Sequence, residues 1–127
     1  MATLIASEAE IKRACEDYLQ YQQNLGNLVW FRLNSGMIVA NSKGKSYVVK
    51  GCQKGTSDLL VVRKGVVGAC PVHTHTGVEV AMPIFIEVKR VGAKLSEAQW
   101  EFGHKVADVG ADYRVVHSLD ELMEILE

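Results

Sequence analysis

The sequence lacks several features that would place it in other classes of protein. No apolar run approaches the roughly 18 residues that a membrane-spanning helix needs. The first residues, "MATLIASEAEIKR", show no basic start followed by an apolar core, so we expect no secretory signal. No repeat, low-complexity segment or linker interrupts the 127 residues, and we expect one domain, residues 1–127, in the cytoplasm. The cysteines are few, odd in number and widely spaced, which argues against a disulfide scaffold and favours a reducing compartment: Cys15, Cys52 and Cys70.

The chain also has little net charge, −1, which by itself predicts no polyanionic partner. The distribution of charge is more informative. Residues 28–65 contain seven of the fourteen basic residues but only one of the fifteen acidic residues, Asp58. This segment is either one face that binds phosphates or a set of solvated hairpin loops. Its basic residues are Arg32, Lys43, Lys45, Lys50, Lys54, Arg63 and Lys64.

Three segments are predicted to be helices. Apolar residues recur at helical spacing in "SEAEIKRACEDYLQYQQ". Gly110 is a natural end for a second helix, "EAQWEFGHKVADVG", and "LDELMEILE" forms a third. Each is preceded by a serine with Glu or Gln three residues later, the pattern of a capping box: Ser7–Glu10, Ser96–Gln99 and Ser118–Glu121.

The remaining segments read as short β-strands separated by Gly, Asn, Ser and Lys. Five lie between the first two helices and one follows the second: "LVWFRLN", "GMIVAN", "KSYVVKG", "SDLLVVRKG", "GVEVAMPIFIEVK" and "DYRVVHS". The predicted fold is therefore α/β or α+β, with a central mixed β-sheet flanked by helices.

Two of these strands carry charged residues that are unusual in apolar strands. In "FIEVK", alternation places Phe85, Glu87 and Lys89 on one face. In "GTSDLLVV", Asp58 stands at the start of a strand. If the two strands pair, Asp58 and Glu87 lie within a few ångströms, an arrangement that is costly unless a cation joins the carboxylates. Alternatively, Glu87 and Lys89 are an ordinary charge pair on an exposed strand.

Oxygen ligands without a His or Cys cluster suit a hard ion, Mg²⁺ or Mn²⁺. Such an ion lowers the pKa of a coordinated water and stabilises a pentavalent phosphate. Lys89 on the same face would hold the water or neutralise the phosphate. The charged face of the strand then becomes the floor of an active site.

An ordered set of motifs resembles a known family. "GTSDLLVV", "FIEVKRVGAKLSEAQWEF" and "VGADYRVVHSLDEL" contain Gly-X-Ser-Asp, Glu-Val-Lys, Leu-Ser-X-X-Gln and Gly-X-X-Tyr-X-Val-Val. Together they resemble the VRR-NUC group of the PD-(D/E)XK nuclease superfamily, from about Glu8 to Glu121. The resemblance implies a restriction-endonuclease-like core with the order α-β-β-β-α-β-α.

The resemblance also implies roles for particular residues. Asp58 and Glu87 would be metal ligands, with the main-chain carbonyl of Val88 as a third, and Lys89 would be the catalytic lysine. Gln99 would belong to the site, or it only caps its helix as the third residue after Ser96.

An acid in the first helix completes the site in this family, and two candidates are present. Glu10 is accounted for by Ser7, whereas Glu8 precedes Ile11 and Cys15 on the core-facing stripe. We therefore predict Glu8 as the further ligand, directly or through water. Alternatively, Glu8 is only a first-turn acid favoured by the helix dipole.

The implied reaction is phosphodiester hydrolysis that leaves a 5′-phosphate. The resemblance implies a stand-alone, phage-type domain acting in a bacterial host as a homodimer that resolves four-way DNA junctions, since two-fold symmetry matches two-fold symmetry. A nuclease for flaps or ends, and a non-catalytic DNA-binding module, are the alternatives. Arg32 and Lys43 are weaker candidates for contacts to phosphates. The expected phosphate contacts are Lys50, Lys54, Arg63, Lys64, Arg90 and Lys94.

One further segment, "CPVHTHTG", contains a cysteine and two histidines within six residues. Its cysteine and histidines could bind zinc with Cys52, although the spacing matches no zinc pattern well. The other interpretation is a hairpin tip between the two active-site strands, which reaches DNA or a second subunit.

Overall fold

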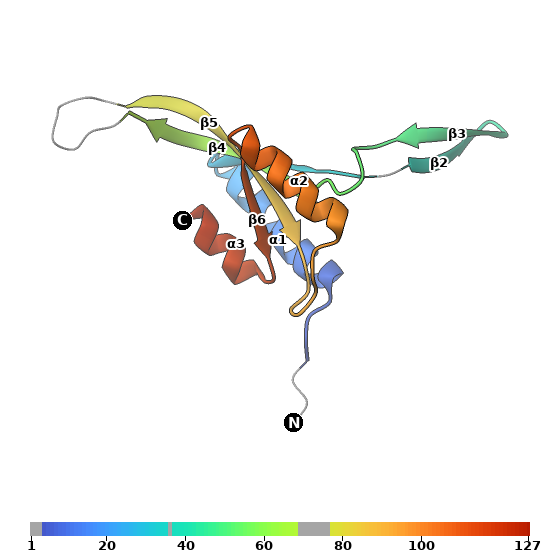
Figure 1. Ribbon diagram of the computed structural model, residues 1–127, viewed down its shortest axis with the longest axis horizontal. Helices are drawn as coiled ribbons and strands as arrows, with labels where there is room; N and C mark the ends of the chain where they lie inside the picture. The colour runs from blue at the N-terminus through green and yellow to red at the C-terminus, as the bar shows by residue number, and fades with distance from the viewer. Residues whose placement is uncertain (1–3, 36, 69–76) are drawn as a thin grey trace.

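The computed structural model describes residues 4–35, 37–68 and 77–127. Within these described residues, three helices and six strands follow one another along the chain (Figure 1). They are α1 (Glu8–Asn24), β1 (Leu28–Arg32), β2 (Met37–Ser42), β3 (Lys45–Lys50), β4 (Leu59–Val67), β5 (Val78–Val88), α2 (Glu97–Asp108), β6 (Asp112–Val116) and α3 (Leu119–Leu126). Every helix and strand predicted from the sequence is present, with bounds that differ by a few residues.

The central sheet has the strand order β1-β4-β5-β6. Strand β4 pairs antiparallel with β1 and β5, whereas β6 runs parallel to β5, so the sheet is mixed as predicted. Without the β2–β3 pair, which lies between β1 and β4 in the sequence, the order of elements is the expected α-β-β-β-α-β-α.

Helices cover both faces of the sheet (Figure 1). Ile11, Cys15 and Leu19 of α1 and Leu122 of α3 are buried with the apolar strand residues in one core. Those strand residues are Leu28, Leu59, Val61, Ile84, Ile86, Val88 and Val116. Helix α2 covers the opposite face, where Phe102 packs edge-to-face against Phe85. The alternation of β5 therefore separates an apolar face from the face that carries Glu87.

The predicted capping boxes differ in outcome. Around α2, Ser96 accepts a hydrogen bond from the Gln99 amide and the Gln99 side chain accepts one from the Ser96 amide, so the box is complete. In α1 and α3 the serines form their half of the box. In α3, however, the Glu121 carboxylate accepts a hydrogen bond from the main-chain amide of His117 and contacts its ring nitrogen. It does not bond the amide of Ser118. The full capping box predicted there is wrong, because His117 offers that carboxylate two partners.

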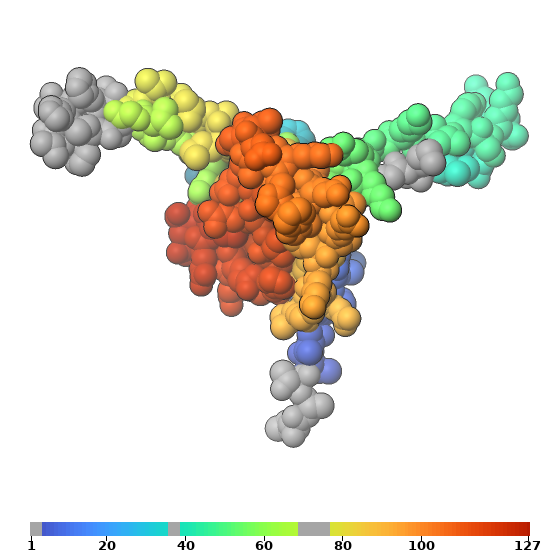
Figure 2. All heavy atoms as spheres, in the orientation of Figure 1, coloured from blue at the N-terminus to red at the C-terminus, as the bar shows by residue number. Residues whose placement is uncertain are grey.

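Two arms extend from the body of the molecule on opposite sides (Figures 1 and 2). One is the outer part of β4 and β5, and the other is the β2–β3 hairpin, which forms a separate two-stranded sheet. No helix in the described part of the chain is long and apolar enough to cross a membrane.

Candidate active site

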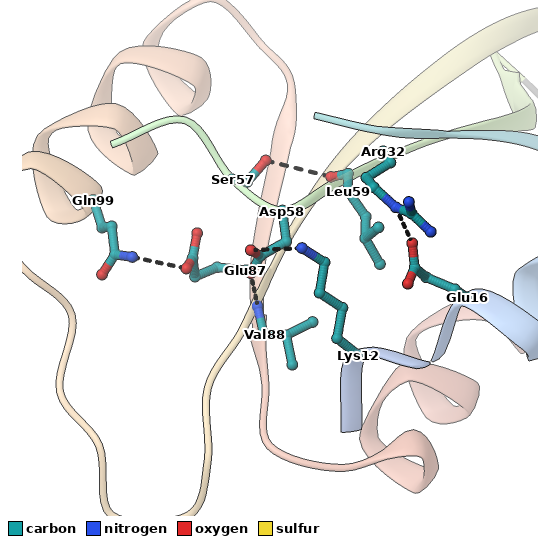
Figure 3. A network of polar contacts seen from close by, with 9 residues as sticks. All are labelled: Lys12, Glu16, Arg32, Ser57, Asp58, Leu59, Glu87, Val88 and Gln99. Atoms are coloured by element: carbon teal, nitrogen blue, oxygen red, sulfur yellow. Dashed lines mark hydrogen bonds and ion pairs between the residues drawn. The ribbon is translucent and has the colours of Figure 1, made fainter. Parts of the chain in front are cut away.

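The register of β4 and β5 brings the two predicted carboxylates together. Leu59 pairs with Ile86, which places the preceding Asp58 beside Glu87 and Val88. Asp58 Oδ2 accepts a hydrogen bond of 2.7 Å from the main-chain amide of Val88 (Figure 3). The predicted pairing of these strands is confirmed. The hydrogen bond from the Val88 amide fixes the orientation of the Asp58 carboxylate.

The residues before Asp58 hold it by a close approach to α2. Gly55 has φ +89°, and a Cβ there would lie 2.3 Å from the carbonyl oxygen of Ala98. Only glycine permits this conformation and this contact at low cost. Ser57 is buried, and its hydroxyl donates to the Leu59 carbonyl at 3.3 Å. The "GTSD" segment is therefore a connection that positions Asp58 against the helix bearing Gln99.

Glu87 is buried, with 2% of its surface exposed. Its Oε1 accepts a 2.9 Å hydrogen bond from Nε2 of Gln99 (Figure 3). The Gln99 amide oxygen accepts a 2.8 Å bond from the Ser96 amide at the same time. Gln99 thus caps its helix through its oxygen and contacts Glu87 through its nitrogen, so the capping role does not prevent the predicted site role.

The surroundings of Glu87 disfavour its charged form. Burial, and then the negative charge of Asp58, raise the pKa of Glu87 to about 8, while Lys89 acts in the opposite direction. The charge of Glu8 raises this pKa slightly as well, but Glu8 is exposed, and within the described residues it does not form a metal-binding group with Asp58 and Glu87. A buried carboxylate such as that of Glu87 is stabilised when a cation neutralises it.

Lys12 is a site residue that the sequence analysis missed. Its Nζ lies 3.5 Å from Oδ1 of Asp58 (Figure 3). Lys12 lies one helical turn after Glu8 and next to the buried Ile11. The available signal was this i, i+4 spacing, which places Lys12 and Glu8 on the same side of the helix.

Tyr113 of β6 was also missed as a neighbour of the site. Its hydroxyl is buried, and within the described residues it has no hydrogen-bond partner. Burial and the charges of Glu87 and Asp58 raise the pKa of Tyr113. Its ring lies where a Cβ at Gly103 would come within 2.8 Å, so the glycine lets β6 approach α2 closely.

The predicted phosphate contacts fall into two groups. Arg63 donates to the carbonyls of Leu126 and Ile125, which ties β4 to the end of α3, and Lys64 pairs with Glu79 at 3.4 Å. The other four are exposed at the surface: Lys50, Lys54, Arg90 and Lys94. The candidate zinc ligands Cys70, His73 and His75 lie outside the described residues.

The donor set can be tested against a hard divalent ion. In residues 4–35, 37–68 and 77–127 no three His, Cys, Asp or Glu side chains are grouped as for a metal. Mg²⁺, however, is commonly held by one or two carboxylates and keeps several waters. Glu87 Oε2 is buried without any hydrogen-bond partner in the described structure, beside the Asp58 carboxylate. Two adjacent carboxylates with a free buried oxygen fit this ion.

A comparison with protein-family models gives a match to the VRR-NUC domain over residues 6–120, nearly the whole chain. The chain belongs to the VRR-NUC family. Membership implies a nuclease-type function with DNA as substrate. The match includes Asp58, Glu87 and Gln99, which the structure brings together. No curated protein and no solved structure matches the chain significantly.

Proposed function

We propose that this VRR-NUC protein is a Mg²⁺- or Mn²⁺-dependent, structure-specific DNA endonuclease that resolves four-way junctions as a homodimer. The observation that supports it best is the buried Glu87 beside Asp58, with one carboxylate oxygen unpartnered in the described structure. A buried carboxylate next to a second, partly exposed one reduces stability, and a catalytic requirement for a cation accounts for the arrangement.

Each residue of the site has a role in this proposal. Asp58, Glu87 and the Val88 carbonyl would hold the ion, with Glu8 bound directly or through water. When bound, the ion would supply Lewis-acid activation of water and neutralise charge on the phosphate. Gln99 holds Glu87 in place through its 2.9 Å hydrogen bond. Lys89, partly exposed on the same strand face, would orient the attacking water or neutralise the phosphate.

The substrate specificity is proposed from shape and symmetry. Lys50, Lys54, Arg90 and Lys94 are exposed and would contact phosphates, which position DNA without reading its sequence. Arg63 and Lys64 stay in the proposed set: Arg63 also donates to main-chain carbonyls of α3, and the ion pair of Lys64 with Glu79 is exposed, so a phosphate would replace it at little cost. One site in each chain requires two chains to cut a two-fold symmetric junction at paired positions.

A cleavage assay tests this function. Labelled four-way junction, 5′ flap, single strand and linear duplex are incubated with Mg²⁺ or Mn²⁺, and the wild type is compared with Glu87→Gln. We expect paired symmetric nicks in the junction, and a loss of at least about 1000-fold in the variant, because metal activation contributes several kcal/mol. Lys105→Gln, an exposed change at the far end of α2, is the control.

Other outcomes select the alternatives. Metal-dependent cutting of flaps or ends alone would retain the active site and exclude junction resolution. Junction binding without cutting of any substrate would favour a DNA-binding module that has lost catalysis.

A further inference from the structure

The β2–β3 hairpin is an excursion from the body of the protein. Its strands pair with each other, not with the central sheet, and every residue of β3 is exposed. At its base, Ser35 bridges to Cys52, and the Cys52 amide donates to the Asn34 carbonyl at 2.6 Å. The arm therefore begins and ends at one point. A lone two-stranded hairpin is marginally stable in water, so burial of this arm against a partner would stabilise it.

The arm is strongly basic. Residues 33–57 contain four lysines and no acidic residue: Lys43, Lys45, Lys50 and Lys54. A surface with one sign of charge attracts a partner of opposite charge. A second copy of the arm would bring the same lysines and would be repelled, whereas a nucleic-acid backbone is complementary along its whole length.

The turn at the tip of the arm has a lysine at a position where glycine or asparagine is conformationally preferred. Lys43 and Gly44 join the strands with φ values of 51° and 73°. Positive φ at both central residues is the property of a type I′ turn, which prefers Asn, Asp or Gly at the first position. Among non-glycine residues of the described structure, only Lys43 has positive φ. A strained lysine thus occupies the point that lies farthest along the arm.

The sides of the arm carry polar groups as well as exposed apolar ones such as Val39 and Val48. Asn41 and Ser46 face each other, joined by a 2.7 Å side-chain hydrogen bond, and both are exposed. Tyr47 on the other face is 48% exposed. The major groove of DNA, about 12 Å wide, accommodates a two-stranded β-ribbon. The geometry points to the β2–β3 arm as a ribbon that enters the major groove of the duplex next to the cleavage site, an inference that rests on the proposed DNA endonuclease function.

Lys43→Asn separates a DNA contact from a structural role. Asparagine fits the turn better than lysine, so stability should be unchanged or higher. Binding to a labelled junction is measured by anisotropy in EDTA at several salt concentrations. We expect about 3- to 10-fold weaker binding and a salt slope smaller by about 0.9, the value for one phosphate contact. Lys105→Gln is the control and should retain both values.

A second variant replaces residues 36–51 by three glycines between the bridged Ser35 and Cys52. It should bind the junction at least tenfold more weakly, and it should lose the protection of guanine N7 from dimethyl sulfate that a major-groove ribbon gives. Unchanged affinity and salt slope in Lys43→Asn would overturn the inference. So would a change from dimer to monomer on shortening while Lys43→Asn binds DNA normally, because the arm would then serve assembly.

The inference and the proposed function can fail separately. Arm-dependent binding in EDTA without metal-dependent cutting would refute the endonuclease and support the arm. Cutting that depends on Glu87, with binding unaffected by either arm variant, would refute the arm and support the endonuclease.

Discussion

At the end of β5 nearest the site, two adjacent residues on opposite faces are equally buried but opposite in chemistry. Ile86 is 0% exposed against the core formed with α1 and α3, and Glu87, the next residue, is 2% exposed beneath α2. Burial stabilises the fold on the first face because it removes apolar surface from water. At Glu87, on the second face, burial opposes folding, because it raises the pKa of this residue and holds its carboxylate near Asp58.

The two faces of β5 therefore have different roles. The apolar face of β5 provides stability, and the charged face holds a site that the fold supports at a cost. Substitutions on the two faces should therefore have opposite consequences for stability and for cleavage.

Ile86→Ala should lower the free energy of unfolding by about 2–5 kcal/mol, as expected when a large buried side chain is truncated. Glu87→Gln should leave stability unchanged or higher at neutral pH while it removes cleavage. Urea unfolding followed by circular dichroism measures the first effect, and the junction assay measures the second. Equal loss of stability in both variants would contradict the division between the faces.

The stability of the wild type should fall as pH rises from about 5 to 8. The ordinary pKa of 4.5 is raised to about 8 in Glu87, so the folded protein retains a proton that the unfolded chain releases. Stability from this group is complete below the lower pKa and decreases by up to about 1.4 kcal/mol per pH unit within the window.

Glu87→Gln is the matched variant for this pH dependence, since it is neutral throughout. Unfolding in EDTA should show a flatter profile for the variant between pH 5 and 8. A wild-type profile that is just as flat would mean that Glu87 titrates near its ordinary pKa. Its surroundings would then not destabilise the charged carboxylate.

Gly55→Ala should lower the free energy of unfolding by about 2 kcal/mol, because it disturbs the connection that holds Asp58 against α2. The substitution incurs the cost of a left-handed conformation, about 1–2 kcal/mol, and a contact of 2.3 Å with the Ala98 carbonyl. Gly110→Ala is the control, because Gly110 has φ +91° but no atom within 4 Å of the added Cβ. Cleavage should fall more in Gly55→Ala, as Asp58 moves. Identical losses in both variants would show that the contact with Ala98 is unimportant.

Local patterns predicted the elements and the faces of β5 well. Alternation separated Ile86 from Glu87, and a serine with glutamine three residues later located the start of α2. The pairing of Asp58 with Glu87 was also predictable, because consecutive strands are commonly neighbours.

Contacts between distant segments could not be predicted in the same way. Lys12 meets Asp58 because α1 packs against β1 and β5 of the sheet, and helix periodicity contains no information on that packing. Strand propensity does not indicate that β2–β3 forms a sheet of its own, with a bridge between Ser35 and Cys52 at its base. Tyr113 was missed because its approach to α2 depends on Gly103, ten residues earlier and on another element.

The smallest predicted effect concerns Lys12, the cation that the chain itself supplies to the charged face. Its ammonium lies 3.5 Å from Asp58 Oδ1, with 29% of the side chain exposed. Lys12→Gln should lower stability without metal by less than about 1 kcal/mol, since partly exposed ion pairs contribute little. It should also strengthen Mn²⁺ binding by roughly 3- to 10-fold, because a positive charge near the ligands opposes a divalent ion.

Thermal unfolding at increasing Mn²⁺ concentration measures both effects, since a ligand of the folded state raises the melting temperature with its affinity. Lys64→Gln removes a similar lysine, paired with Glu79 at 3.4 Å on the β4–β5 arm, and should leave Mn²⁺ binding unchanged. Tighter binding in both variants would indicate a general effect of net charge. Weaker binding in Lys12→Gln alone would mean that Lys12 helps to assemble the ligands, and the charged face would then depend on α1 for its geometry as well as for its charge.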